Sequence, residues 1–332
     1  MLKIGNLTLS SPYILAPLSG ISDLPFRMLN RSLGCELAFV PMISARSMVY
    51  QSRDTKKMLL SVPSDRPLGI QLLGNDPHDL HRALNILQKY EFDIIDFNAA
   101  CPVNKVTGKG KGAGLLKEPL KLRELLKIVV DNSHVPVTVK IRSGWDDTSV
   151  NARDIALYAQ DAGVKGLFIH GRTRVQGYRG RVDYKVIRKV KDALEIPVIA
   201  SGDAFSPHLI RKMFNETGCD GVVIARGALG NPWIFRETKE LLEHGTIPER
   251  PALNEIINTM LIHLKLCTDY HGEVIGTMLF RKFFAWYTKG FPDIKPLRDK
   301  AFCAETREQM EEIIKEQQTS QRPDYLSLSQ VF

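Results

Sequence analysis

The stretch Ile94-Ile-Asp-Phe-Asn-Ala-Ala-Cys-Pro102 opens with a short apolar run and closes with a polar loop, an arrangement that recurs along this chain of 332 residues. Eight such runs cover residues 13–16, 37–42, 68–72, 94–97, 137–141, 167–169, 198–200 and 222–224. Their hydrophobicity is nearly continuous instead of alternating, which is typical of parallel strands covered on both faces. The runs therefore predict a parallel sheet of eight strands.

Helix-like segments separate most of these runs. Apolar residues recur at helical spacing in residues 79–90, 120–130 and 152–161, and Ser206-Pro207 opens a further segment at 206–214 as an N-cap followed by proline. Eight strands with their helices, spread over about 240 residues, match a (β/α)8 TIM barrel. An open doubly wound sheet would need a Gly-x-Gly-x-x-Gly turn after its first strand, and Ala16-Pro-Leu-Ser-Gly20 is not such a turn.

The pattern changes after Trp233. Glu249-Arg250-Pro251 is typical of a linker, and residues 253–270, 277–289 and 305–317 are predicted helices, with Gly272 as the stop of the first. We therefore predict two domains, a TIM-barrel catalytic domain over residues 1–245 and a small helical bundle of three or four helices over residues 246–332. The tail, residues 318–332, is expected to be partly disordered.

Composition favours a cytoplasmic protein. No apolar run approaches the ~20 residues of a membrane helix, and the first residues lack the apolar core of a signal peptide. The five cysteines are scattered and form no Cys-x-x-Cys pair, so neither a disulfide framework nor a metal site is expected.

The net charge of +8 is concentrated in two clusters. Residues 165–191 carry nine basic side chains and one acidic one, and residues 104–127 carry seven basic and two acidic side chains. Such clusters are either solvated helix faces or a surface that binds phosphate groups, and charge alone leaves both interpretations open.

Polar residues end the predicted strands, and the chemistry of a (β/α)8 barrel lies at these carboxyl ends. Short glycine-containing turns follow the last two strands, Ser201-Gly-Asp203 and Arg226-Gly227. This pair of turns is the usual phosphate cradle of the fold, where backbone N–H groups bind the anion.

Three further strand residues have two interpretations each. Lys140, if it points into the barrel, needs an anionic partner such as the N1–C2=O edge of a reduced flavin; otherwise it points outward into solvent. Gln71 fits a hydrogen bond to a flavin's pyrimidine edge or a loop contact. His170 fits a cofactor or substrate contact or a structural histidine.

Cys101 differs from the other four cysteines. It follows a buried strand and precedes Pro102 in a loop rich in glycine and lysine. Because loop cysteines at a barrel mouth are candidate acids or nucleophiles, Cys101 is either a catalytic residue or an inert buried thiol.

The chain resembles the tRNA-dihydrouridine synthases, in particular their DusB-like branch. The resemblance covers essentially the whole sequence. It runs through Ala16-Pro-Leu-Ser-Gly-Ile-Ser-Asp23, Asn98-Ala-Ala-Cys-Pro-Val103, Val137-Thr-Val-Lys-Ile-Arg-Ser-Gly-Trp145, His170-Gly-Arg-Thr-Arg174, Ala225-Arg-Gly-Ala-Leu-Gly-Asn-Pro-Trp233 and Phe280-Arg-Lys-Phe-Phe-Ala-Trp-Tyr287.

The resemblance implies a set of functional residues. FMN would lie across the barrel mouth, with Gln71, Lys140 and His170 at its ring. Gly202, Asp203, Arg226 and Gly227 would hold its phosphate. The pocket would be completed by Ala16, Pro17, Leu18, Ser201 and Ala225.

For the substrate, Asn98 would bind the target uracil, Cys101 would be the proton donor, and Arg142 and Tyr178 would line the uridine pocket. The helical domain would clamp tRNA. The sequence departs from the commonest family pattern at Ala99-Ala100, Ser201 and Leu18.

The implied reaction is reduction of the C5=C6 bond of uridine in tRNA. FMN, reduced by NADPH that binds transiently, would pass hydride from N5 to C6, while Cys101 protonates C5. The target base would have to leave its stack, and phosphate contacts by residues 105–127 and 172–191 would offset that cost. No membrane association and no obligate protein partner are expected.

Two alternatives remain at this point. A dihydroorotate-dehydrogenase-like enzyme also uses an Asn…Cys-Pro loop on a pyrimidine, but has no use for a helical appendage. An RNA-binding protein on an inactive barrel would have no use for Cys101, Lys140 and His170.

Overall fold

The computed structural model describes residues 1–316 and has a closed parallel sheet at its centre. Its strands are β3 (Tyr13–Leu15), β4 (Leu37–Phe39), β5 (Ile43–Ser44), β6 (Leu68–Leu73), β7 (Ile94–Asn98), β8 (Val137–Arg142), β9 (Gly166–His170), β10 (Val198–Ser201) and β11 (Gly221–Ile224). β4 and β5 each pair in parallel with β6, every other strand pairs in parallel with the next, and β11 pairs with β3, which closes the ring. The predicted (β/α)8 barrel is confirmed.

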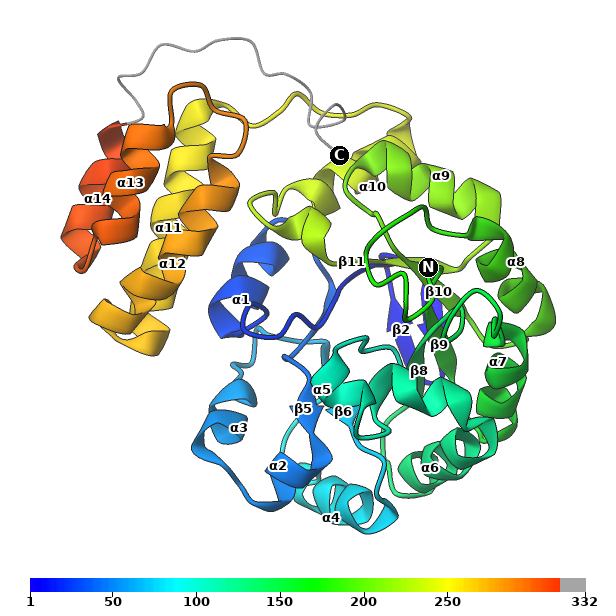
Figure 1. The fold of residues 1–332 in the computed structure, drawn as a ribbon. Coiled ribbons are helices and arrows are strands. Elements are labelled where there is room, and N and C mark those ends of the chain that lie inside the picture. Colours follow the sequence, from blue (N-terminus) through cyan, green and yellow to red (C-terminus); the bar gives the residue numbers. More distant parts are fainter. Residues whose placement is uncertain (317–332) are drawn as a thin grey trace.

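Helices surround the sheet (Figure 1). They are α1 (Leu24–Ser32), α2 (Ala45–Val49), α3 (Arg53–Met58), α4 (Pro77–Leu87), α5 (Asn104–Thr107), α6 (Pro119–Asp131), α7 (Ala152–Asp161), α8 (Tyr184–Ala193), α9 (Pro207–Thr217) and α10 (Ile234–His244), with short 3-10 turns η1 (Gly112–Lys117) and η2 (Arg226–Ala228). The four helices predicted between strands correspond to α4, α6, α7 and α9. Ser206 caps α9 through the N–H of Leu209, as its sequence position predicts.

The second strand differs from its prediction. The apolar run at residues 37–42 was expected to be continuous, but the structure divides it into β4 and β5. Val40 still donates its N–H to the carbonyl of Gly69 at 2.9 Å. Pro41 has no N–H to continue the ladder, so the strand is interrupted there.

An N-terminal hairpin was not predicted. Strands β1 (Leu2–Ile4) and β2 (Leu7–Leu9) pair antiparallel, and Leu2, Ile4 and Leu9 are buried in the same apolar cluster as the inward-facing barrel residues. Leu2 lies against Gly221 and Ile4 against Gly166, the first residues of β11 and β9. The hairpin therefore fills the amino end of the barrel, opposite the end that carries the polar residues.

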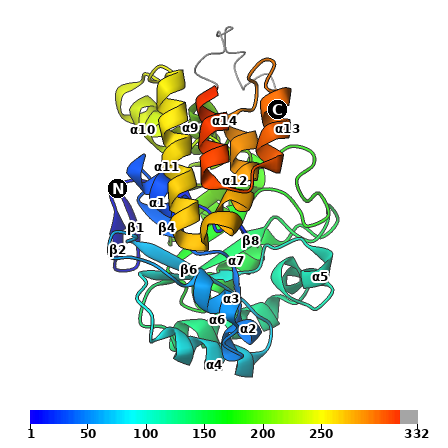
Figure 2. The same ribbon diagram turned by 90° about the vertical axis from the view of Figure 1, so that its left-hand side faces the viewer.

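The C-terminal region is helical, as predicted (Figures 1 and 2). It contains α11 (Leu253–His271), α12 (Glu273–Tyr287), α13 (Lys295–Cys303) and α14 (Arg307–Glu316). Gly272 ends α11, as expected, with φ of 84°. The helix α13 was not separately predicted, and the prediction for residues 318–332 lies outside the described residues. The boundary at residues 245/246 stays a prediction.

Specific contacts join this region to the barrel beside β3. Phe26 on α1 stacks on Phe283 of α12, with ring centroids 5.7 Å apart. His271 at the end of α11 contacts the Asp23 carboxylate at 2.7 Å, and Lys282 donates to the carbonyl of Gly20 at 2.6 Å. Because Gly20 and Asp23 belong to the loop that follows β3, the helical region is fixed next to the barrel mouth. Among residues 1–316, no helix is both long and apolar enough to cross a membrane.

Candidate active site

A cavity of about 360 Å³ opens at the carboxyl ends of the barrel strands. Its volume falls in the range of small-molecule sites, ~300–1,000 Å³. The structure brings all sixteen site residues expected from the sequence to its wall: Ala16, Pro17, Leu18, Gln71, Asn98, Cys101, Lys140, Arg142, His170, Tyr178, Ser201, Gly202, Asp203, Ala225, Arg226 and Gly227.

Strand register explains why these polar residues meet. Asn98 is level with Lys140 in the β7–β8 ladder, and Arg142 is level with His170 in the β8–β9 ladder. Gln71 is level with Asp96. Side chains two residues apart on a strand point to the same face, so one barrel-facing set contributes an apolar layer at the amino end and a polar layer at the mouth.

A chain of hydrogen bonds crosses the polar layer. The Asn98 amide Nδ2 donates to Gln71 Oε1 at 2.7 Å, and Gln71 Nε2 donates to Asp96 Oδ2 at 2.7 Å. The Thr138 hydroxyl donates to the other oxygen, Asp96 Oδ1, at 2.8 Å. Asp96 is 1% exposed, and burial raises the pKa of its carboxyl to about 6.

Asn98 also holds the loop that carries Cys101. Its Oδ1 accepts the N–H groups of Ala100 at 3.0 Å and Cys101 at 2.9 Å. On the other side of the loop, Arg142 Nε donates to the Ala100 carbonyl at 2.8 Å. Ala99 and Ala100 are 0% and 4% exposed, so both side chains are packed inside the protein. Nothing in the structure explains the departure from the family pattern at these two positions.

Lys140 points into the cavity. Its Nζ is buried and has no hydrogen-bond partner within residues 1–316. Burial lowers its pKa to about 8, partly offset by Asp96. A buried ammonium without a partner is expensive. The Lys140 ammonium would therefore be stabilised by a ligand that carries an anionic or strongly accepting group. The N1–C2=O edge of a flavin is such a group.

His170 is held neutral. It is 7% exposed, and burial, followed by the charges of Arg142 and Lys140, lowers its pKa well below the usual range. Its Nε2 lies 3.5 Å from Arg172 Nη1. A neutral imidazole with this single long contact keeps hydrogen-bonding capacity for a ligand in the cavity.

The turns after β10 and β11 touch each other and form one concave wall. A Cβ on Gly227 would lie 2.0 Å from the Ala204 carbonyl oxygen. A Cβ on Gly202, whose φ is +120°, would lie 2.7 Å from Val182 and 2.8 Å from His170. Both positions therefore require glycine, and their backbone can approach a ligand closely.

Asp203 pairs with arginines in this wall. Its carboxylate accepts from Arg172 Nη1 at 2.9 Å and lies 3.5 Å from Arg226 Nη2. A phosphate would therefore meet the Asp203 backbone and Arg226 instead of the Asp203 carboxylate. Arg226 also lies over the Tyr178 ring, 4.6 Å from its centroid, so Tyr178 forms part of the rim.

Two buried charged residues that hydrogen-bond to the site residues were not singled out from the sequence, Asp96 and Arg172. Asp96 interrupts an apolar strand, and this isolated charge was a usable signal. Arg172 is 2% exposed and donates to the Gly180 carbonyl as well as to Asp203. Its role depends on a tertiary contact that local pattern does not reveal.

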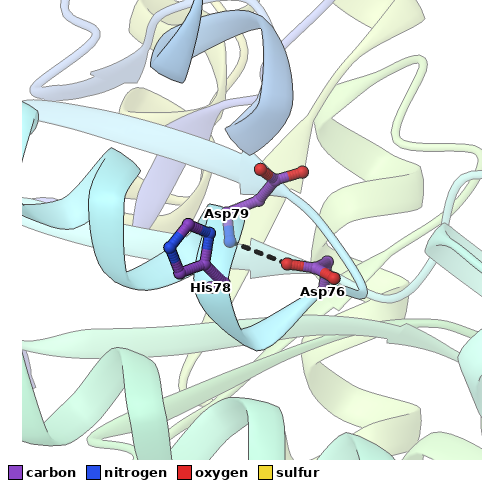
Figure 3. A group of neighbouring side chains, drawn as sticks. All are labelled: Asp76, His78 and Asp79. Carbon is purple, nitrogen blue, oxygen red and sulfur yellow. Dashed lines mark hydrogen bonds between the residues drawn. The ribbon is translucent and has the colours of Figure 1, made fainter.

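A separate cluster of potential cation ligands, Asp76, His78 and Asp79, lies at the start of α4 (Figure 3). Ligand atoms of Asp76, His78 and Asp79 lie within 4.8 Å of one another. Asp76 Oδ1 accepts the N–H of Asp79 at 2.8 Å, the usual arrangement of a helix N-cap. Capping explains Asp76, and we assign the group no further role.

Fold and cavity together define a (β/α)8-barrel protein with a polar cavity of small-molecule size at its mouth. The model of the family described as dihydrouridine synthase (Dus) matches residues 14–322, and the chain belongs to this family. It is 37% identical to tRNA-dihydrouridine synthase B of Pseudomonas aeruginosa over 90% of both chains. It is also 37% identical to the protein of that name from Vibrio cholerae, over 93% of this chain and 96% of that one.

A solved structure supports the fold. The histamine dehydrogenase from Rhizobium sp. 4-9 superposes with a TM-score of 0.54 at 13% identity, covering 80% of this chain and 50% of that one. Family membership makes the protein a flavin-dependent oxidoreductase of the DusB-like group.

Proposed function

We propose that this protein is an FMN-dependent tRNA-dihydrouridine synthase, which reduces the C5=C6 bond of specific uridines in tRNA with NADPH as electron source. The observation that carries the proposal is the buried Lys140 ammonium, which has no hydrogen-bond partner among residues 1–316 and lines a cavity that also holds Cys101. The tRNA substrate leads us to expect activity in the cytoplasm.

Lys140, Gln71 and His170 would hold the flavin ring, and the backbone of Gly202, Asp203 and Gly227, with Arg226, would hold its phosphate. FMN, when bound and reduced, supplies the hydride that C6 of uracil accepts. Lys140 would neutralise negative charge at the ring's N1–C2=O edge. Ala16, Pro17, Leu18, Ser201 and Ala225 would exclude water from the ring's surroundings.

Cys101 would give its thiol proton to C5 of the uracil. The thiol lies in a loop fixed by Asn98 and Arg142, so the proton would be held at a defined position. Arg142 and Tyr178 would line the uridine pocket. The amide oxygen and the NH2 group of Asn98 are both already bonded. One of the two Nδ2–H bonds, however, reaches only the Met42 sulfur at 3.2 Å. Because sulfur is a weak acceptor, a uracil carbonyl would replace it.

The proposed tRNA surface surrounds the mouth. Exposed basic residues of the two charge clusters lie on loops that follow β7 and β9, among them Lys105, Lys109, Arg179 and Arg181. The exposed apolar residues Val103, Val175 and Tyr178 lie on the same loops. This mixture of cations and apolar side chains suits phosphates and unstacked bases. The helical region beside the mouth would provide a second contact with tRNA.

The helical parts of the clusters contribute less to this surface. Arg188 on α8 donates to the carbonyls of Glu216 and Asn215, and Lys191 pairs with Asp220 at 2.7 Å. These contacts lie on the outer ring of helices. We therefore narrow the proposed surface from residues 105–127 and 172–191 to residues 105–111 and 174–181, in the segments that follow β7 and β9.

The decisive experiment combines flavin spectroscopy with a tRNA assay. Purified protein is expected to bind FMN, whose absorbance NADPH bleaches and unmodified tRNA restores, with dihydrouridine appearing in the tRNA. Lys140→Met is expected to weaken FMN affinity by ~10-fold or more, since a hydrogen bond to a charged group contributes about 1.5–3 kcal/mol. Bleached flavin that tRNA does not reoxidise would overturn the substrate assignment, and unchanged FMN affinity in Lys140→Met would overturn the cofactor pose.

A further inference from the structure

The buried carboxylate of Asp96 belongs to β7, the strand that leads into the proposed catalytic loop. It is absent from the cavity wall, yet both of its oxygens accept hydrogen bonds, one from Gln71 and one from Thr138. An ionised carboxylate only accepts, so the Gln71 amide must turn its NH2 group towards Asp96.

This requirement passes along the chain of amides. With Nε2 on Asp96, Gln71 presents Oε1 to Asn98, so Asn98 must in turn present Nδ2 to Gln71. Asn98 Oδ1 is then left facing the N–H groups of Ala100 and Cys101, which it accepts. If Gln71 were reversed, its NH2 group would face the NH2 group of Asn98. If Asn98 were reversed, its NH2 group would face the N–H groups of Ala100 and Cys101, and the loop would lose both bonds.

We propose that Asp96 is a positioning residue whose carboxylate fixes the amide orientations of Gln71 and Asn98 and thereby the loop that carries Cys101. The same orientation leaves the second Nε2–H of Gln71 directed away from Asp96. The kinetic consequence rests on the proposed function, but the structural consequence for Cys101 does not.

Three variants distinguish this positioning role from a general effect on the stability of the protein. Asp96→Ala removes the acceptor and frees both amides. Asp96→Asn keeps an acceptor for Gln71, because the new amide can turn its NH2 group to the Thr138 hydroxyl. Thr138→Val is the matched control: it removes an equally buried hydrogen bond to the same carboxylate without touching Gln71.

The first measurement is the alkylation rate of Cys101 by iodoacetamide, read by peptide mass spectrometry with exposed Cys303 as internal reference. We expect Asp96→Ala to change the Cys101/Cys303 ratio at least ~3-fold, while Asp96→Asn and Thr138→Val leave it near the wild-type value. A ratio unchanged in Asp96→Ala, or changed equally in Thr138→Val, would overturn the proposal.

The second measurement compares the two half-reactions in FMN-loaded protein. Asp96→Ala is expected to slow reoxidation by tRNA at least ~10-fold, because small displacements of a reacting group have large kinetic effects, while reduction by NADPH changes less than ~3-fold. Asp96→Asn should restore most of the tRNA rate. Equal losses in both half-reactions, or no rescue by Asp96→Asn, would contradict the positioning role. Wild-type protein inactive on tRNA would instead refute the proposed function, and the alkylation ratio would still test the role of Asp96.

Discussion

The loop residue Cys101 is the only cysteine on the cavity wall, and Cys35, Cys219 and Cys267 are buried elsewhere among the described residues. Its backbone is bonded on both sides, because its N–H reaches Asn98 and its carbonyl accepts the N–H of Ala113 at 3.0 Å. The side chain is thus the one part of the residue free to meet a substrate.

Replacing that thiol tests its role. We expect Cys101→Ala to keep FMN bound and to slow uridine reduction by ~10²-fold or more, because it removes a general acid and leaves the cofactor contacts in place. Flavin absorbance and dihydrouridine content of tRNA are the measurements. Cys303→Ala, on exposed α13, is the control, and unchanged turnover on tRNA in Cys101→Ala would exclude proton donation by this residue.

The candidate catalytic residues of the loop could be predicted from the sequence, but the hydrogen bonds that hold the loop in place could not. Asn98 and Cys101 follow an apolar run and Lys140 lies near the end of another, so their place near strand ends is a local property. The orientation of Lys140 was open, because alternation in a strand buried on both faces does not say which side is inward. Asp96 acts through Gln71 and Thr138, which come from two other strands, and only the register joins them.

Among the elements, the turns after β10 and β11 work as a pair. Gly227 lies against the Ala204 carbonyl so closely that any side chain would push the two turns apart. Their contact shapes the wall proposed to hold the FMN phosphate, so the spacing of the turns sets the shape of that site.

A methyl group at this contact should therefore damage phosphate binding. Gly227→Ala is expected to weaken FMN affinity by ~10-fold or more, since at least one charge-assisted hydrogen bond is lost. Riboflavin, which lacks the phosphate, is the control ligand and should lose much less affinity. Fluorescence titration measures both, and equal losses for the two ligands would place the phosphate elsewhere.

The helices and strands predicted from the sequence agree with the structure where the apolar pattern is long, and disagree with it where the pattern is short. The helices α11 and α4 carry clear apolar stripes and were found. The strands β1 and β2 have three residues each, too few for a convincing alternation, although Gly5-Asn6 between them is a recognised hairpin dipeptide. Pro41 marks the break between β4 and β5 in the sequence. The prediction followed the apolar pattern of residues 37–42 and disregarded this proline.

At the scale of the whole molecule, the junction between barrel and helical region contains a buried histidine. His263 on α11 lies among Phe26, Phe280 and Phe283, and its Nδ1 is 3.1 Å from the Tyr287 hydroxyl. Burial lowers the pKa of this histidine to about 3. The folded state therefore keeps it neutral at pH values where the unfolded chain binds a proton.

This difference makes stability depend on pH in one direction. Between the folded pKa of about 3 and the usual 6.5, the unfolded state binds more protons, so the free energy of unfolding falls as pH falls. From pH 7.5 to pH 5 we expect this residue to contribute a loss of about 2 kcal/mol. Urea titrations should show a smaller loss for His263→Phe; an identical loss in that variant would refute the assignment.

The overall charge predicts how tRNA binding responds to salt. Each phosphate contact adds about 0.7–0.9 to the slope of log affinity against log salt concentration. Arg179→Ala and Lys105→Ala, on the mouth loops, should each reduce the slope by roughly that amount. Arg188→Ala is the control, because its guanidinium is engaged on the outer ring. An equal effect of Arg188→Ala would move the proposed surface away from the mouth.

The hairpin at the amino end of the barrel also has a consequence for biosynthesis. Leu2 and Ile4 leave the ribosome before the strands that begin at Gly166 and Gly221, against which they pack. At ~5–20 residues per second, the chain holds these apolar side chains without their final partners for tens of seconds. The hairpin, translated before both of these strands, is therefore among the last segments to reach its place, and closure of the barrel waits for its final strand.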